Sequence, residues 1–230
     1  MRTLLSASAA LATVGLPAAL HAEELEIYTG FAVVSEYLSD GFELSDGVAV
    51  QPYIEAAYGG FYAGIWATNA DGSDVTFYAD TEVDYYLGYR GEWGSFYYDV
   101  SVAYYTFQRP NEFSGLEDYE EYILSAGYAI TDQLYATLTY GNAPDIDQDD
   151  LTLDIEYYTN VPGLTLAAQI ADYSIDDVGD WMTYSIGASY AIDDAVTLDL
   201  TYTDSDSDGV DLGATDGIFV ASISFDFQIR

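Results

Sequence analysis

Nearly every second residue of segment 75–89 is apolar, and this alternation constrains the fold more than any other feature of the chain. The residues between the apolar ones include three acids, Asp80, Glu82 and Asp84. Because successive side chains of a β-strand point to opposite faces, the pattern predicts a strand with one apolar face and one acidic face. The chain then turns within GEWG (91–94) and repeats the pattern. Lipid on the apolar side and a wetted lumen on the acidic side would explain both strands.

The alternation continues in about twelve segments, each near the ~9–11 residues with which a tilted strand crosses a bilayer. The predicted strands span residues 26–39, 48–58, 61–69, 75–89, 95–107, 118–130, 134–140, 151–159, 164–173, 181–192, 195–203 and 218–228. Tyrosines near strand ends suit the aromatic girdles of a membrane barrel. These are Tyr89, Tyr128, Tyr140, Tyr190 and Tyr202. A soluble protein would use such tyrosines in its core or at its rim, so no single tyrosine distinguishes a membrane barrel from a soluble protein.

The connections between these segments alternate between short and long. The short ones are residues 59–60, 91–94, 131–133, 160–163 and 193–194, and the longer, acidic ones are 40–47, 70–74, 108–117, 141–150, 174–180 and 204–217. Alternation puts the tight turns at one end of the molecule and the long loops at the other, as in outer-membrane barrels. We therefore predict an all-β, antiparallel up-and-down transmembrane barrel of about twelve strands. A β-sandwich with the same strand spacing is the alternative, although it has no reason to segregate its loops.

The first 22 residues have the features of a secretory signal peptide. A positive charge at Arg2 precedes an uncharged apolar stretch that ends in the small residues of LPAALHA. We predict cleavage after Ala22 and a single barrel domain over residues 23–230. A transmembrane anchor is the alternative, but the apolar stretch is short for a span of about 20 residues.

The composition is strongly acidic, with 40 Asp and Glu against 4 Lys and Arg and a net charge of −36. Such a surface repels nucleic acid and attracts cations. A saline habitat is an equally good explanation of the acidity. Half of the residues are hydrophobic and 16% are aromatic, which excludes a disordered chain. The absence of cysteine agrees with export.

The sequence lacks the side chains that most enzyme mechanisms require. The only histidine, His21, lies in the predicted signal peptide, and the chain has neither cysteine nor lysine. Nucleophilic triads and histidine-ligated zinc are therefore excluded. Carboxylates two residues apart, such as Asp154 and Glu156, would lie roughly 7 Å apart, a spacing compatible with glycoside hydrolysis. Acids are so abundant here that a wetted lumen explains these pairs without catalysis, and we expect no enzyme.

The inward faces of the predicted strands are acidic. The predicted pore-lining residues are Glu55, Asp80, Glu82, Asp84, Asp99, Glu121, Asp154, Glu156, Asp199 and Asp226. Such a lumen prefers cations, and Arg90 is the one basic residue expected near it. A twelve-stranded barrel is narrow, and inward tyrosines such as Tyr97 and Tyr105 could plug it. The alternatives are a non-conducting barrel with acidic surface loops for adhesion or envelope integrity, and a soluble calcium-binding sandwich.

One acidic loop has partial calcium-loop spacing. Asp204, Asp206 and Asp208 alternate before Gly209, an arrangement that offers oxygen ligands to a hard cation. The glutamate usual at the twelfth position is replaced by Thr215. A weak calcium site in the extracellular loops is one interpretation, and a solvated acidic loop is the favoured one.

Several stretches resemble the TorF family of outer-membrane porins. They are VVSEYLSDGFELSDG (33–47), GGFYAGIWATNAD (59–71), the segment 82–110 and DYEEYILSAGY (118–128). The resemblance implies an exported barrel with a pore, embedded in outer-membrane lipid and inserted by the barrel assembly machinery. It implies no catalytic residue and no particular solute.

The chain departs from that family in two places. The family has arginines in a motif that here reads Ser-Glu-Tyr-Leu-Ser-Asp-Gly (35–41), so we expect small cationic or neutral solutes rather than anions. The chain ends FDFQIR without a terminal aromatic, so recognition by the assembly machinery is expected to rest on Phe225 or Phe227. The oligomeric state is left open.

Overall fold

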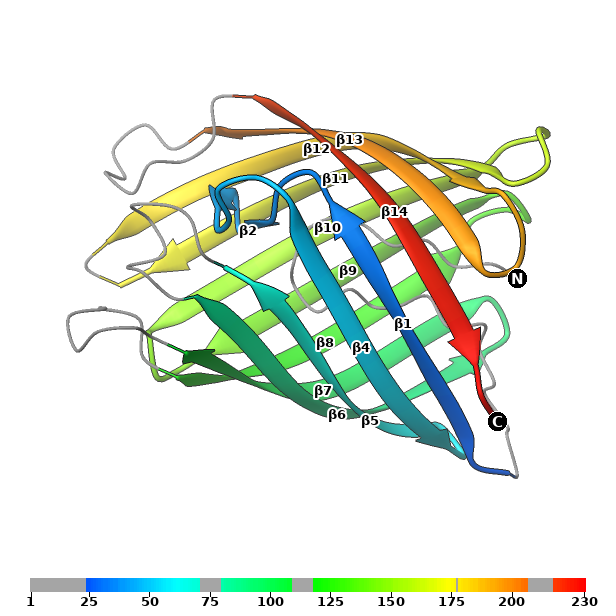
Figure 1. Cartoon of the computed structure of the whole chain (residues 1–230), viewed down its shortest axis with the longest axis horizontal. Helices are drawn as coiled ribbons and strands as arrows, with labels where there is room; N and C mark the ends of the chain where they lie inside the picture. The colour runs from blue at the N-terminus through cyan, green and yellow to red at the C-terminus, as the bar shows by residue number, and fades with distance from the viewer. Residues whose placement is uncertain (1–23, 71–79, 109–117, 177, 207–216) are drawn as a thin grey trace.

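The computed structural model describes residues 24–70, 80–108, 118–176, 178–206 and 217–230, and these residues form a closed antiparallel barrel (Figure 1). The twelve strands of the barrel are β1 (Glu26–Val34), β4 (Ala49–Tyr58), β5 (Phe61–Asn69), β6 (Thr81–Trp93), β7 (Phe96–Gln108), β8 (Tyr119–Ala129), β9 (Leu134–Ala143), β10 (Gln148–Tyr158), β11 (Leu164–Ile175), β12 (Gly179–Ala191), β13 (Val196–Asp206) and β14 (Ile218–Gln228). Each strand pairs with its sequence neighbour in the barrel, and β1 pairs with β14 to close the ring. The barrel prediction is confirmed, and the β-sandwich alternative is wrong. The expected signal peptide lies outside the described residues.

The outer face of the barrel is apolar because apolar and polar residues alternate along the strands and the apolar ones point outward. In β6, for example, Tyr85 and Leu87 are exposed to the outside, whereas Glu82, Asp84 and Tyr86 are buried. An apolar surface of this kind suits lipid, and closure of the ring leaves none of the described barrel strands with an unpaired edge that lipid could not satisfy. The described residues contain no helix long and apolar enough to cross a membrane.

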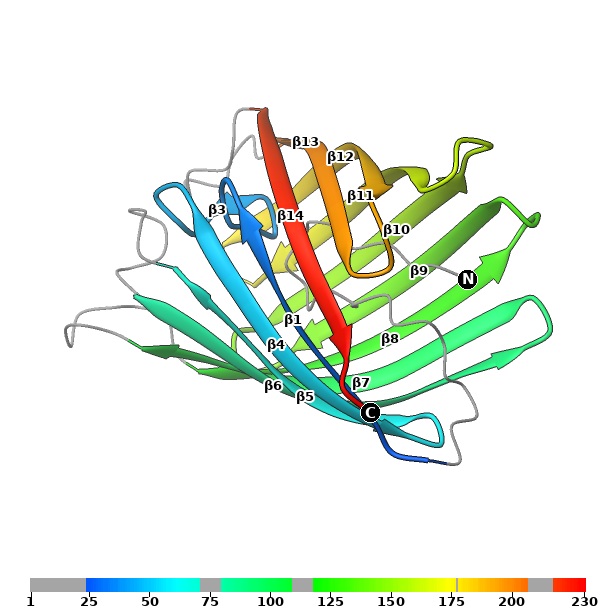
Figure 2. The same ribbon diagram turned by 45° about the vertical axis from the view of Figure 1, so that its right-hand side comes forward.

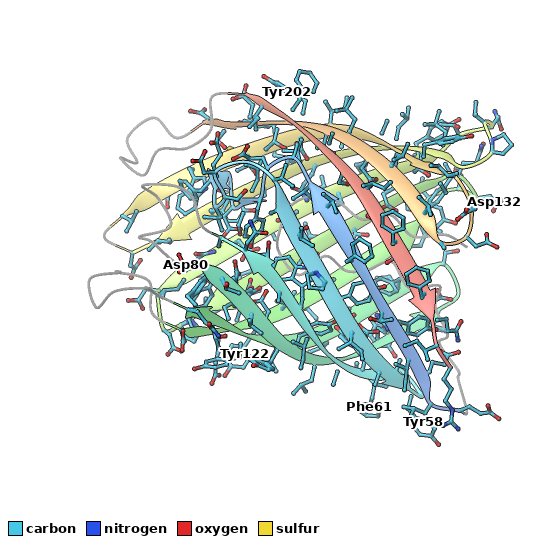
Figure 3. The ribbon with its side chains drawn as sticks, viewed as in Figure 1. Tyr58, Phe61, Asp80, Tyr122, Asp132 and Tyr202 are labelled. Atoms are coloured by element: carbon cyan, nitrogen blue, oxygen red, sulfur yellow. The ribbon has the colours of Figure 1, made fainter. Side chains whose placement is uncertain are left out.

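Aromatic side chains gather at both ends of the outer face. Tyr58 and Phe61 point outward at one end of the barrel, and Tyr122 and Tyr202 point outward near the other (Figure 3). The predicted girdle tyrosines Tyr89, Tyr128, Tyr140 and Tyr190 are exposed, and Tyr202 is half-buried beside Phe219. Two aromatic belts around an apolar band place the barrel across an outer membrane.

The two ends of the barrel differ. One, which we call the turn end, carries the tight connections at 59–60, 94–95, 130–133, 159–163 and 192–195; the other is the loop end. Two connections predicted to be long are short, because the strands continue through acidic stretches. The predicted loop 141–150 shrinks to residues 144–147 and the predicted loop 174–180 to 176–178. Backbone pairing does not require apolar side chains, so acid-rich sequence was wrongly interpreted as loop. Residues 75–79 of the predicted fourth strand lie outside the described residues.

The connection between β1 and β4 is the largest departure from the prediction. The first strand ends at Val34 rather than Ser39, and the chain then forms a small hairpin of β2 (Leu38–Ser39) and β3 (Phe42–Glu43). This β2–β3 hairpin lies within the ring of strands at the loop end (Figures 1 and 2), whereas residues 40–47 were predicted to form an outer loop. Its side chains are buried against the barrel wall: Tyr37 is 2% exposed and Leu38 5%.

Candidate functional site

Most of the predicted pore-lining acids lie on the inward face of the barrel. Glu55, Glu82, Asp84, Asp99 and Asp199 are buried, and Glu121, Asp154, Glu156 and Asp226 are half-buried, on strands whose alternate residues face outward. Asp80 differs from them. It precedes β6 at the loop-end rim, and its side chain is exposed (Figure 3).

One half of the interior, lined by β1 and β4 to β7, is filled with aromatic side chains. Tyr53 donates a hydrogen bond to Asp226 Oδ1 (2.8 Å) across the seam, and Tyr62 donates one to Asp99 Oδ1 (2.7 Å). Tyr105 donates to Glu121 Oε2 (2.6 Å). Each phenol thus satisfies a carboxylate that burial would otherwise leave without water. Tyr97 and Tyr105, predicted to point inward, belong to this filled half.

Arg90 is the one basic side chain that faces the interior among the described residues. It forms an ion pair with Glu55, and its guanidinium lies over the Tyr62 ring, 4.4 Å from the ring centre. The arginine is therefore neutralised by a wall carboxylate and held by a cation–π contact. It contributes little positive charge to the rest of the interior.

The other half of the interior, lined by β9 to β13, carries small polar side chains. The inward residues at mid-barrel that are half-buried rather than buried include Thr137, Thr139, Thr152, Ala167, Gln169, Ser185, Gly187 and Thr201. Asp154 accepts a hydrogen bond from Gln169 Nε2 (2.8 Å) on this wall, and Glu156 lies one inward position further along β10. The interior therefore has one half rich in aromatic rings and one half rich in hydroxyl side chains, several of which are half-buried.

The β2–β3 hairpin reaches both halves at the loop end. On the packed side, Tyr37 donates a hydrogen bond to Glu82 Oε2 (2.9 Å). On the opposite side, Trp181 of β12 donates from Nε1 to the backbone oxygen of Asp40 (2.7 Å) and meets the Phe42 ring edge-on, with ring centres 5.3 Å apart. The hairpin thus crosses the interior and narrows it.

Two ionisable side chains of this hairpin have altered pKa values. Burial raises the pKa of Tyr37 well above its usual value, with the neighbouring Glu82 and Asp84 acting in the same direction. Burial, together with repulsion from Asp150, raises the pKa of Asp40 to about 7. Tyr37 therefore stays protonated as a donor, and Asp40 titrates near neutrality.

The hairpin was missed in the sequence although a signal for it exists. Asp40 and Gly41 both have positive φ, 53° and 88°, as a two-residue hairpin turn of type I′ requires. Asp-Gly between alternating apolar residues, here Leu38 and Phe42, is a strong hairpin signal. That signal gives the turn but not the surface against which the hairpin packs.

Of the predicted calcium loop, the structure describes Asp204 and Asp206. Asp204 accepts hydrogen bonds from Tyr202 Oη (3.2 Å) and from the backbone nitrogens of Ser205 (2.9 Å) and Gly217 (3.3 Å). Asp206 is exposed, and Asp208 lies outside the described residues. Within the described ranges, no three acidic or histidine side chains are placed to hold a metal ion. The calcium site stays a prediction.

Comparison with known proteins agrees with the architecture. The NanC porin superposes with a TM-score of 0.56 at 12% identity, over 89% of this chain and 99% of that one. A bacterial polysaccharide outer membrane secretin superposes with a TM-score of 0.51 at 10% identity, over 87% of this chain and 71% of the secretin. No curated protein matches the sequence. A family of bacterial proteins of unknown function, Gcw_chp, matches residues 18–223. The chain therefore belongs to the Gcw_chp family and forms a porin-like outer-membrane barrel.

Proposed function

We propose that the protein is an outer-membrane channel for passive diffusion of small hydrophilic solutes and that it prefers cations. The observation that carries the proposal is the unequal interior: half-buried hydroxyls and carboxylates line β9 to β13, whereas aromatic rings fill the opposite half. The polar side chains of such a wall can be hydrated and can form hydrogen bonds with a solute along one side of the barrel. The NanC porin and the TorF resemblance are in keeping with a pore.

The preference for cations follows from the charges on that wall. Asp154 and Glu156 face the hydroxyl-rich half, and Arg90, the interior arginine, is already paired with Glu55. A narrow passage lined by carboxylates attracts cations and repels anions. Neutral solutes of similar size would pass according to their fit rather than their charge.

Conductance and reversal potential in a planar bilayer, under a potassium chloride gradient, test both parts of this proposal. We expect discrete current steps and a cation-selective reversal potential. Replacing Asp154 with Asn and Glu156 with Gln together should move that potential toward zero, because two lumen charges are removed without a change in side-chain size.

Asp132→Asn with Asp193→Asn is the matched control. Both residues are exposed in turn-end connections, so salt near 1 M, with a Debye length of about 3 Å, should screen their effect on ions in the passage. An equal shift from the control pair would place selectivity at the mouth. No conductance from protein shown to be folded and inserted would refute the channel, and would favour a non-conducting barrel that presents acidic loops.

A further inference from the structure

The tip of the β2–β3 hairpin packs against a set of acids that has no basic partner among the described residues. Asp40 accepts a hydrogen bond from Gln148 Nε2 (3.3 Å) of β10, and its side chain is also hydrogen-bonded to the side chain of Tyr173 of β11. Its carboxyl also feels the charges of Asp150 on β10, Glu121 on β8 and Glu82 on β6. The remaining titratable groups that face it are two phenols, Tyr173 and Tyr119. From β12 and β13, the hairpin tip contacts the uncharged side chains of Trp181, Thr183 and Ser205.

Two arrangements in this set require protons. The carboxyl oxygens of Glu121 and Asp150 converge beside Gly141, where an added Cβ atom would lie 2.3 Å from Glu121 Oε1 and 2.1 Å from Asp150 Oδ1. Two ionised carboxylates in such close approach repel each other, and a proton on one of them removes that repulsion. Asp84, 2% exposed beside Glu82, has an Oδ1 atom without any hydrogen-bond partner. An ionised carboxylate buried in this way would be costly, so the packed arrangement calls for neutral acids.

We propose that the hairpin tip and the barrel wall beneath it form a proton-binding site, with Asp40, Glu121 and Asp150 as its members, and that proton occupancy controls docking of the hairpin. With protons bound, the hairpin lies across the interior. When the protons leave, repulsion between Asp40 and the wall acids releases it toward the loop end. The inference goes beyond the proposed channel, because docking can be measured whether or not the barrel conducts.

The direction of the pH dependence follows from Asp40. Its pKa is about 7 in the docked hairpin, against an ordinary value of 3.8 when the hairpin is free in water. Between these values the docked form holds the extra proton, so each rise in pH disfavours docking. Docking is therefore strongest below about pH 4, weakens up to about pH 7 and is constant above it.

A cysteine introduced into the hairpin measures its release directly. The chain has no cysteine, so Leu38→Cys (5% exposed at rest) reports the undocked state, and Val48→Cys (63% exposed) serves as the reference at the foot of the hairpin. Both full-length variants are folded into lipid vesicles, and their rates of modification by a thiol reagent are measured from about pH 5 to about pH 8. The ratio of the two rates, which cancels the intrinsic ionisation of the thiol, should rise more than about tenfold over that range.

Asp40→Asn in the Leu38→Cys background is the decisive variant. Asparagine keeps the shape and the acceptor for Gln148, tolerates the positive φ of this turn and cannot lose a proton. We expect the rate ratio to stay low and flat. Asp46→Asn, the same change at an exposed position of the same connection, should leave the pH dependence intact.

The possible results distinguish failure of the proton site from failure of the channel function. A flat ratio in the parent protein, or a rise that survives Asp40→Asn, would overturn the proposed proton site, provided that heat-dependent gel mobility confirms a folded barrel. A normal rise in a barrel that never conducts would refute the channel function and leave the proton site standing.

Discussion

At the scale of single residues, the sequence predicted which side chains face inward but not which of them pair. Alternation alone put Glu55 and Arg90 near the interior, because each strand has only two faces. Their ion pair joins β4 to β6 across β5, and the contact of Arg90 with Tyr62 adds the strand between them. Contacts of this kind depend on side-chain conformations in the closed barrel, which periodicity does not encode.

The ion pair gives a prediction for stability. Arg90→Met should lower the free energy of unfolding by about 3 kcal/mol, because it leaves the buried Glu55 carboxylate without its charged partner. Adding Glu55→Gln to that variant should recover part of the loss, since the unpaired charge is then gone. Equilibrium unfolding by urea from lipid vesicles measures both values. Additive losses in the double variant would show that the two residues do not act as a pair.

At the scale of elements, strands were predicted better than connections. A strand can be recognised from the alternation of its own residues. The place where a connection packs depends instead on residues far away in the sequence. The β2–β3 hairpin illustrates the difference: Asp40-Gly41 encodes the turn, but its surface comes from Trp181, Thr183 and Ser205, over 140 residues later in the chain. The start of β10, with Asp149 and Asp150, was missed for the opposite reason, because acidic composition outweighed alternation in the prediction.

The close approach of the hairpin turn to β12 and β13 can be tested at Gly41. A Cβ atom there would lie 2.5 Å from Ser205 Oγ and 2.6 Å from Thr183 Cγ2, in a backbone with φ of 88°. Gly41→Ala should therefore undock the hairpin and expose Trp181, seen as a red shift of tryptophan emission and faster quenching, while the barrel stays folded. Gly47→Ala is the control, because Gly47 has a similar φ of 98° but open space around it. If both variants behave alike, backbone strain rather than the contact with the wall is responsible.

At the scale of the whole molecule, the fold class followed from a property repeated along the entire chain. One apolar face per strand has few solutions: another layer must cover it, or lipid must. The segregated tight turns then favoured a barrel over a sandwich. Errors of a few residues at strand ends did not alter that conclusion, since each strand keeps the same two faces.

Lipid exposure of the outer face predicts a dependence on depth. Leu87, 59% exposed near the middle of β6, should tolerate arginine poorly, with a loss of about 2–4 kcal/mol in unfolding free energy from vesicles. Phe61, 65% exposed in the turn-end girdle (Figure 3), should lose only about 0–1 kcal/mol on the same change, because its position is close to water. Equal costs at the two positions would contradict the assigned membrane band.

The pairing of β1 with β14 joins segments from opposite ends of the chain, Tyr28–Val34 against Ser222–Gln228. The other barrel pairings join neighbours along the sequence, so pairing at this seam closes the longest loop and has the largest loop-closure entropy cost. Past the seam, Ile27 and Arg230 are themselves hydrogen-bonded through their backbones (3.0 Å). A chain in which these ends are linked and a new opening is cut between β9 and β10 should therefore reach the same barrel, with its old seam now an ordinary hairpin. The order in which the strands are made would change, and the architecture would not.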